Sequence, residues 1–245
     1  MRILTLDIET SPNVADVWSL WNVNVGLSQL RTPSRMMCWA AKWHGRPKVM
    51  FRSEFHDGRE AMVAEAHALL EQADVLVTYN GKRFDTPNLH REFLLGELPP
   101  PAPFTEVDLY QVVKSRFRFP SNKLDHIAQA LDIGKKASHE GHGLWTACIA
   151  GDEKAWGRMK RYNQQDVRLT EELYDRLLPW VKGHPHHGLY ADKPDVCQRC
   201  GHGVLHRRGL AYTPLGVYQQ FQCQGCKGWS RGKKSVATVD TRSTQ

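Results

Sequence analysis

Four carboxylates in three short segments are the residues of this chain best suited to metal chemistry: Asp7, Glu9, Asp85 and Asp166. Hard carboxylate oxygens are ligands that suit Mg²⁺ or Mn²⁺. Two such ions can hold both the attacking and the leaving oxygen of an in-line displacement. The four residues therefore indicate metal-dependent cleavage of a phosphodiester bond.

The first three carboxylates follow strand patterns. Asp7 and Glu9 fall in the apolar run 2–10, which predicts a buried strand. Residues i and i+2 of a strand project to one face, so both carboxylates point the same way. Asp85 comes directly after a second apolar run at residues 74–80 and ends the segment Asn-Gly-Lys-Arg-Phe-Asp.

The fourth carboxylate shares a helix face with a tyrosine. Tyr162 and Asp166 occupy positions i and i+4 of a stretch rich in helix-forming residues. Side chains at this spacing are neighbours on a helix surface. The spacing alone also fits an ordinary half-buried tyrosine.

The three segments read Asp7-Ile-Glu9-Thr10, Asn80-x3-Phe84-Asp85 and Tyr162-x3-Asp166. Together they resemble the three exonuclease motifs of the DEDD superfamily, in its DnaQ-like tyrosine (DEDDy) branch. That branch includes proofreading 3′→5′ exonuclease domains on a ribonuclease H-like fold. The resemblance covers about residues 1–180 and keeps the order and approximate spacing of all three motifs.

The resemblance implies roles for the matched residues. The four carboxylates would hold two Mg²⁺ or Mn²⁺ ions on the scissile phosphate, and Tyr162 would orient the attacking water. Asn80 matches the polar residue of the second motif, although it could equally cap the turn after its strand. Lys123 opens a predicted helix, as in related nucleases, and is either a phosphate contact or an ordinary exposed lysine.

The cysteines predict a second metal site. Cys197 and Cys200 form one Cys-x2-Cys pair, and Cys223 and Cys226 form another. In a reducing compartment this pattern is typical of one structural Zn²⁺ rather than two disulfides or free thiols. The surrounding sequence resembles a zinc ribbon.

The net excess of positive charge lies entirely in the C-terminal quarter of the chain. Residues 1–181 contain 23 basic and 23 acidic residues, whereas residues 182–245 contain 10 basic and 3 acidic ones. Lys and Arg neutralise phosphates, so this segment suits nucleic acid. A solvated basic tail, or a ribbon that recruits a protein partner, is the alternative.

The apolar patterns predict an α/β fold with a mixed sheet. Strands are expected at 2–9, 36–43, 47–55, 74–79 and 104–107, and helices at 58–72, after Pro87, through Lys114, and at 123–132, 142–150 and 153–178. Strands followed by alternation of strands and helices are typical of such domains. The five-stranded ribonuclease H-like sheet implied by the resemblance agrees with this pattern.

Composition predicts four segments. An exonuclease domain is expected at 1–181, a linker at 182–195, the ribbon at 196–232 and a flexible tail at 233–245. The histidines at 184, 186 and 187 resemble a metal cluster, but a linker rich in Pro and Gly is expected to be solvated. No run approaches the ~20 apolar residues of a membrane helix, and the early strand leaves no room for a signal peptide, so a cytoplasmic location is expected.

The leading interpretation is a 3′→5′ exonuclease acting on DNA at a single-stranded 3′ end, with the ribbon assisting binding. An exoribonuclease on the same scaffold is the nearest alternative, because no residue is identified that would contact a 2′-hydroxyl. Two further alternatives are a structure-specific endonuclease and a non-catalytic adaptor that binds nucleic acid or a partner protein. A replication or repair protein as partner stays open.

Overall fold

The computed structural model describes residues 1–137 and 141–241. The chain divides into two compact units. One unit is Arg2–Leu173, and the other is Tyr174–Gln245 together with Met1. The division falls inside a long helix, eight residues before the domain boundary that the sequence predicted after residue 181.

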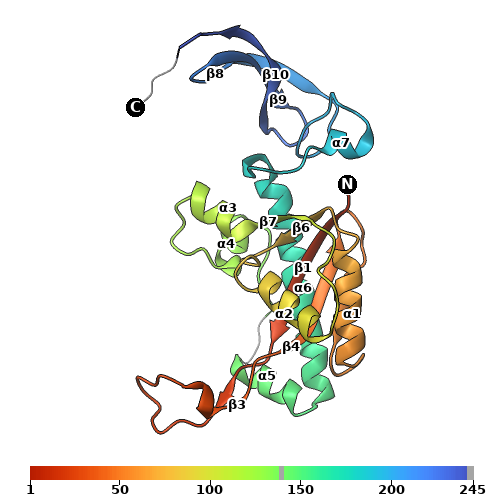
Figure 1. The fold of residues 1–245 in the computed structure, drawn as a ribbon, viewed down its shortest axis with the longest axis vertical. Helices are drawn as coiled ribbons and strands as arrows, with labels where there is room; N and C mark the ends of the chain where they lie inside the picture. Colours follow the sequence, from red (N-terminus) through yellow and green to blue (C-terminus); the bar gives the residue numbers. More distant parts are fainter. Residues whose placement is uncertain (138–140, 242–245) are drawn as a thin grey trace. The chain divides into compact units, whose positions relative to one another are not determined.

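The first unit is built on a mixed five-stranded sheet with the order β5-β4-β1-β6-β7 (Figure 1). Its strands are β1 (Ile3–Thr10), β4 (Met36–Trp43), β5 (Met50–Ser53), β6 (Val75–Thr78) and β7 (Thr105–Asp108). β1, β4 and β5 pair antiparallel, whereas β6 lies parallel to both β1 and β7. The predicted α/β class and mixed five-stranded sheet are confirmed.

Helices cover both faces of this sheet (Figure 1). They are α1 (Arg59–Leu70), α2 (Asp85–Leu95), α3 (Leu109–Arg116), α4 (Leu124–Ala130), α5 (His142–Ile149) and α6 (Glu153–Leu177), and the 3-10 turn η2 (Leu178–Trp180) follows α6. Between β1 and β4 the chain forms a two-stranded sheet of β2 (Val14–Ala15) and β3 (Leu30–Thr32), with the 3-10 turn η1 (Leu27–Gln29) before β3. No helix in the described ranges is both long and apolar enough to cross a membrane.

The alternation of β1 explains how a buried strand can carry carboxylates. Leu4, Leu6 and Ile8 point into a core shared with α1 and α2. The residues between them point to the other face, where α5 and α6 form a second core with β4 and β5. Asp7 and Glu9 therefore project toward the side of the sheet that α6 covers.

α2 begins at Asp85 rather than after Pro87. A proline in the first helical turn removes no intrahelical hydrogen bond, so the helix can start before it. This start places the Asp85 carboxylate in the first turn of α2, at the sheet end where β6 finishes.

The second unit contains a three-stranded antiparallel sheet in the order β10-β9-β8. Its strands are β8 (Leu205–Tyr212), β9 (Gly216–Cys223) and β10 (Trp229–Thr238). The tail predicted from residue 233 is therefore strand as far as Thr238, because residues 235–238 pair with β9. Residues 242–245 of that predicted tail lie outside the described residues.

The predicted linker is also structured. It contains the short helix α7 (His187–Ala191), which His186 caps by accepting a hydrogen bond from the Gly188 N–H. His184 is buried and lies 2.7 Å from the Tyr174 hydroxyl. The expectation that these histidines are solvated is wrong for His184, whose partner lies ten residues earlier at the end of α6.

Candidate active site

Three of the four predicted carboxylates gather at one point of the sheet. Asp7 and Glu9 come from β1, and Asp166 comes from α6. One oxygen of each lies within 4.8 Å of the others. The Asn163 side-chain amide donates to the Asp7 carboxylate over 2.6 Å, and this bond ties α6 to β1 beside the cluster.

Asp85 does not belong to this group of three but interacts electrostatically with Asp7. It is buried, and its Oδ1 accepts a hydrogen bond of 3.0 Å from the backbone N–H of Ile8. Its negative charge is one of the causes that raise the pKa of Asp7. The structure therefore places the Asp85 carboxylate of α2 against the β1 backbone at Ile8, the residue between Asp7 and Glu9.

Burial and mutual repulsion make the carboxyl groups hold their protons. Burial is the largest cause that raises the pKa of Asp7 well above its usual value, and the neighbouring carboxylates add to it. Burial and the charge of Asp166 raise the pKa of Glu9 to about 8. Burial raises the pKa of Asp85 to about 7, although the Ile8 N–H opposes this shift. A bound cation would reverse these shifts.

The donor set fits a divalent cation with hard-ligand preferences. All candidate donors are carboxylate oxygens, which Mg²⁺ and Mn²⁺ accept and softer metals do not prefer. Two oxygens on opposite sides of one Mg²⁺ lie about 4.2 Å apart. Oxygens within 4.8 Å of one another can therefore reach a shared ion after small side-chain movements.

Lys136 is a site residue that the sequence did not identify. Its Nζ lies 2.5 Å from the Asp166 carboxylate and 3.1 Å from the Tyr162 hydroxyl. Burial alone would lower the Lys136 pKa, but the negative charge of Asp166 reverses this and the pKa is raised. The Asp125 carboxylate holds the backbone N–H of Lys136 at 2.8 Å. Asp125 belongs to the helix that follows Lys123, and Lys123 was already a predicted substrate contact. This link to Lys123 was the one feature of the sequence that pointed toward Lys136.

The Tyr162 hydroxyl lies near the Asp166 carboxylate, because Lys136 Nζ contacts both groups. Its ring is held edge-on by Trp145 of α5 at 5.9 Å between centroids, and the Lys136 ammonium lies 5.1 Å from the same ring. Burial, and then the charges of Asp166 and Glu9, raise the pKa of the phenol. Tyr162 therefore stays protonated at neutral pH and can donate a hydrogen bond.

An open cleft of about 700 Å³ adjoins Asp7. Its lining comprises Asp7, Tyr79, Asn80, Arg83, Tyr110, Asn122, Lys123, Leu124, Asp125 and Lys136. Both residues predicted to contact substrate, Asn80 and Lys123, are among them. Asn80 also makes the turn after β6, with φ +70° and its backbone N–H bonded to Asp108 over 2.9 Å.

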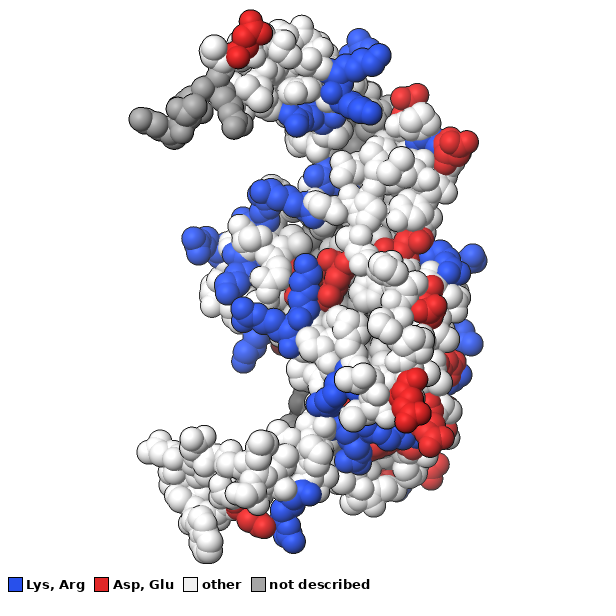
Figure 2. All heavy atoms as spheres, in the orientation of Figure 1, with Lys and Arg blue, Asp and Glu red and all other residues white. Residues whose placement is uncertain are grey.

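Basic side chains lie around this cleft. Arg83, Lys123 and Lys136 line it directly. Figure 2 shows further Lys and Arg side chains gathered over the region of α3 and α4. The exposed basic residues of that region are Lys114, Arg116, Arg118 and Lys123. A polyanion that enters the cleft would meet these charges before it reaches the carboxylates.

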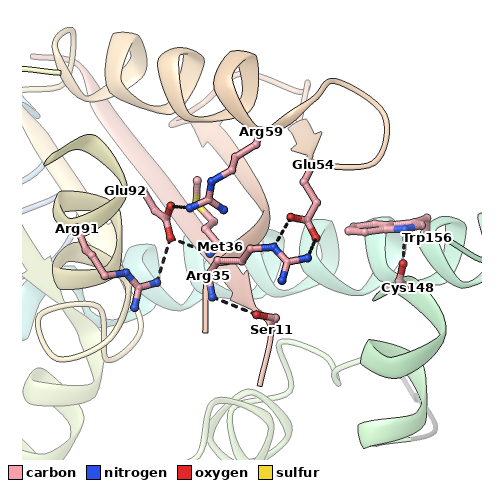
Figure 3. A network of polar contacts seen from close by, with 9 residues as sticks. All are labelled: Ser11, Arg35, Met36, Glu54, Arg59, Arg91, Glu92, Cys148 and Trp156. Atoms are coloured by element: carbon pink, nitrogen blue, oxygen red, sulfur yellow. Dashed lines mark hydrogen bonds and ion pairs between the residues drawn. The ribbon is translucent and has the colours of Figure 1, made fainter. Parts of the chain in front are cut away.

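Glu92 anchors α2, the helix that begins at Asp85, and sequence reasoning did not identify this residue. Its buried carboxylate accepts hydrogen bonds of 3.0 Å from the Met36 N–H of β4 and from Arg91 (Figure 3). Arg59, at the start of α1, forms an ion pair with the other carboxylate oxygen. Glu92 thus joins α2 to both β4 and α1.

The four ribbon cysteines also come together. All four Sγ atoms lie within 4.8 Å of one another, at 3.7 Å between Cys197 and Cys226 and 3.6 Å between Cys200 and Cys223. Two thiolates bound to one tetrahedral zinc at about 2.3 Å lie about 3.8 Å apart. The cluster therefore fits the geometry of one Zn²⁺.

The double substitution Cys197→Ser, Cys200→Ser is expected to remove one zinc ion per chain. A ribbon of this size has little core, so β8–β10 should become sensitive to protease when the metal is lost. Elemental analysis and limited proteolysis of the full-length protein measure both effects. Cys148→Ser is the control, because Cys148 is buried in the first unit and should leave the zinc content unchanged. Full zinc occupancy in the double variant would contradict the assignment.

Comparison with known proteins places the fold. The family model described as RNase_H superfamily matches residues 30–178. The structure of the family B DNA polymerase from the hyperthermophilic archaeon Pyrobaculum calidifontis is similar, with a TM-score of 0.55 and 19% sequence identity. This likeness concerns the fold and covers 87% of this chain but only 31% of the polymerase chain. No curated protein matches the sequence. Since the family model covers more than half of its residues, the chain belongs to the RNase H superfamily.

Proposed function

We propose that this protein is a metal-dependent 3′→5′ exonuclease that hydrolyses phosphodiester bonds of DNA from a single-stranded end. Membership of the RNase H superfamily supports a nuclease. The observation that carries the proposal is the meeting of Asp7, Glu9 and Asp166 within 4.8 Å, beside a cleft lined by basic residues. The 3′→5′ direction and the choice of DNA rest on the resemblance of the three motifs.

The proposed ligands are Asp7, Glu9, Asp85 and Asp166. When bound, two Mg²⁺ or Mn²⁺ ions would supply a nucleophile from water and neutralise charge on the reacting phosphate. Asn163 keeps the Asp7 carboxylate in place through its 2.6 Å hydrogen bond.

Tyr162 and Lys136 would act on the reacting groups themselves. The protonated Tyr162 hydroxyl can hold the attacking water by a hydrogen bond. The Lys136 ammonium, 2.5 Å from Asp166, offsets part of the negative charge that the carboxylates bring to a phosphate site. Lys123 and Arg83 line the cleft where they could pair with the phosphates of the bound strand.

Degradation of end-labelled oligonucleotides tests the proposal. Single-stranded DNA labelled at its 5′ end should yield a ladder that shortens with time in Mg²⁺ or Mn²⁺, and EDTA should stop it. RNA of the same sequence and a circular single strand are the comparison substrates. Faster trimming of RNA would make the protein an exoribonuclease, and cleavage of the circle would make it an endonuclease. No cleavage of any strand with either metal would contradict a nuclease.

Tyr162→Phe is expected to lower turnover by about 10²–10⁴-fold with little change in oligonucleotide affinity. The substitution keeps the ring and its contact with Trp145 but removes the hydroxyl that would hold water. Single-turnover cleavage and anisotropy binding separate the two effects. Tyr110→Phe is the matched control, because Tyr110 lines the same cleft and should lose little activity. Parallel losses of rate and affinity would indicate a structural role for Tyr162.

A further inference from the structure

We propose that one face of the β8–β9–β10 sheet binds single-stranded nucleic acid, with unpaired bases stacking at Tyr218 and a phosphate pairing with Arg231. The surface, named here the Tyr218 face, consists of Tyr218, Gln220, Gln222, His206, Trp229 and Arg231. The inference rests on the proposed function for its choice of ligand. It goes further in naming the residues, the kind of contact and the unpaired state of the bases.

Strand register assigns these side chains to one face. Residues that alternate along a strand share a face, and so do residues directly opposite on antiparallel strands. Gln220 lies opposite Arg231, and Gln222 lies opposite both Trp229 and His206. The next residue after Arg231 points the other way, because a Cβ on Gly232 would lie 3.6 Å from the Phe221 ring.

Tyr218 and Arg231 give the face its stacking group and its cation. The guanidinium carbon of Arg231 lies 4.3 Å from the centroid of the Tyr218 ring. Trp229, on the same face, is 44% exposed. Aromatic rings and guanidinium planes are the groups on which proteins stack unpaired bases. The bases of a duplex are already stacked on one another, so a single strand is the form that suits this face.

The charge of the ribbon complements a polyanion. Residues 196–239 contain no Asp or Glu. Their basic residues are Arg199, Arg207, Arg208, Lys227, Arg231, Lys233 and Lys234. Arg199 and Lys227 donate to backbone carbonyls of the ribbon unit, whereas the other five are exposed. A protein partner of ordinary composition would not require a surface without a single acidic residue.

The opposite face of the same sheet is more apolar. Phe221 lies opposite Arg207, Gln219 opposite Leu210, and Val217 opposite Tyr212. Tyr212 is 77% exposed. This face offers the same residue types, one arginine and one tyrosine, without a cation–π contact between them among the described residues. Substitutions of Arg207 and Tyr212 therefore serve as controls, because they change the same residue types on the opposite face of the sheet.

Fluorescence anisotropy of probe oligonucleotides bound by the full-length protein tests the proposal. Every protein carries Asp7→Ala, which prevents cleavage, so that no chelator is needed and the zinc stays bound. The probes are an oligothymidylate of about 20 nucleotides and an abasic strand of equal length. Tyr218→Leu should weaken binding of the oligothymidylate by about 5- to 150-fold, the effect of one lost stacking contact. It should leave binding of the abasic strand unchanged. Arg231→Gln should lower the log–log salt slope by about 0.7 on both strands.

Control variants make each result decisive. Tyr218→Phe keeps the ring and should bind as before, and Tyr212→Leu and Arg207→Gln should have no effect on the other face. All variants should retain one zinc per chain, which excludes misfolding. Equal affinity for the two strands, a loss confined to the opposite-face variants, or no loss in any variant would each overturn the proposal. The last result would point to a protein partner. Binding as expected without cleavage by the unsubstituted protein would contradict only the proposed nuclease function.

Discussion

Asp7→Ala is expected to abolish hydrolysis of oligonucleotides while the protein stays folded. The substitution removes one of three carboxylates that meet within 4.8 Å. The loss should exceed the about 10–100-fold that removal of an outer partner of a metal ligand costs. Because the substitution also relieves repulsion among buried carboxylates, the metal-free variant should melt no lower than the metal-free parent. Cleavage assays and thermal melting with and without Mn²⁺ measure both properties.

Asn163→Ala is the matched comparison. Asn163 holds the Asp7 carboxylate at 2.6 Å without being a proposed ligand, so its loss should fall within the range of about 10–100-fold. Mn²⁺ should raise the melting temperature of the parent and of Asn163→Ala, and should raise that of Asp7→Ala much less. Near-parental activity in Asp7→Ala, or an unchanged shift with Mn²⁺, would refute the assigned site.

Glu92→Ala is expected to lower the free energy of unfolding of the first unit by about 2–4 kcal/mol. Most of the loss comes from the buried Met36 N–H, which would be left without its acceptor. The ion pairs contribute less, because the Arg59 and Arg91 side chains are 39% and 40% exposed and water can replace the lost partner. Denaturation followed by tryptophan fluorescence measures the change, since Trp39 and Trp156 are buried in this unit.

Glu54→Ala separates the effect of the buried carboxylate from that of an ion pair. Glu54 accepts two hydrogen bonds from Arg35, at 2.8 and 2.9 Å, in the same region (Figure 3). The Glu54 side chain is 16% exposed, against 1% for Glu92. Its loss should therefore lower stability by only about 0–1 kcal/mol. Similar losses in the two variants would mean that the Met36 hydrogen bond contributes little.

The central part of the sheet of the first unit was predictable because β4 and β6 are short runs of almost continuous apolar residues. Residues 36–43 and 74–79 read as buried strands and are found as β4 and β6. The predicted helices at 58–72 and 153–178 correspond to α1 and α6, where apolar residues lie along one face of each helix. These signals are local, so no knowledge of the packing was needed.

The segments that the sequence misjudged lack such periodicity. Residues 182–195 are rich in Pro, Gly and His, yet they include α7 and the buried His184. The residues after 232 are polar and basic, yet β10 continues to Thr238 because β9 supplies its hydrogen bonds. In both segments, order comes from partners elsewhere in the chain, and composition does not reveal them.

By itself, the sequence determined which candidate site residues share a face of their strand or helix. Asp7 and Glu9 are two residues apart on a strand, and Tyr162 and Asp166 are four apart on a helix, so local geometry fixes each pair. The spacing of the cysteines likewise predicted a cluster, and the structure brings the four thiols together.

Tertiary structure alone decided what surrounds those pairs. Lys136 meets Tyr162 across 26 residues of sequence, and Asn163 meets Asp7 across 156. Asp85 was predicted as one of four metal ligands, and only the fold shows that one of its oxygens accepts the Ile8 N–H. Such contacts depend on how β1, α2, α6 and the loop after α4 pack together. The position of a lysine or an asparagine in the sequence does not predict its partner. The ion pair or hydrogen bond that it makes exists only after the chain has folded.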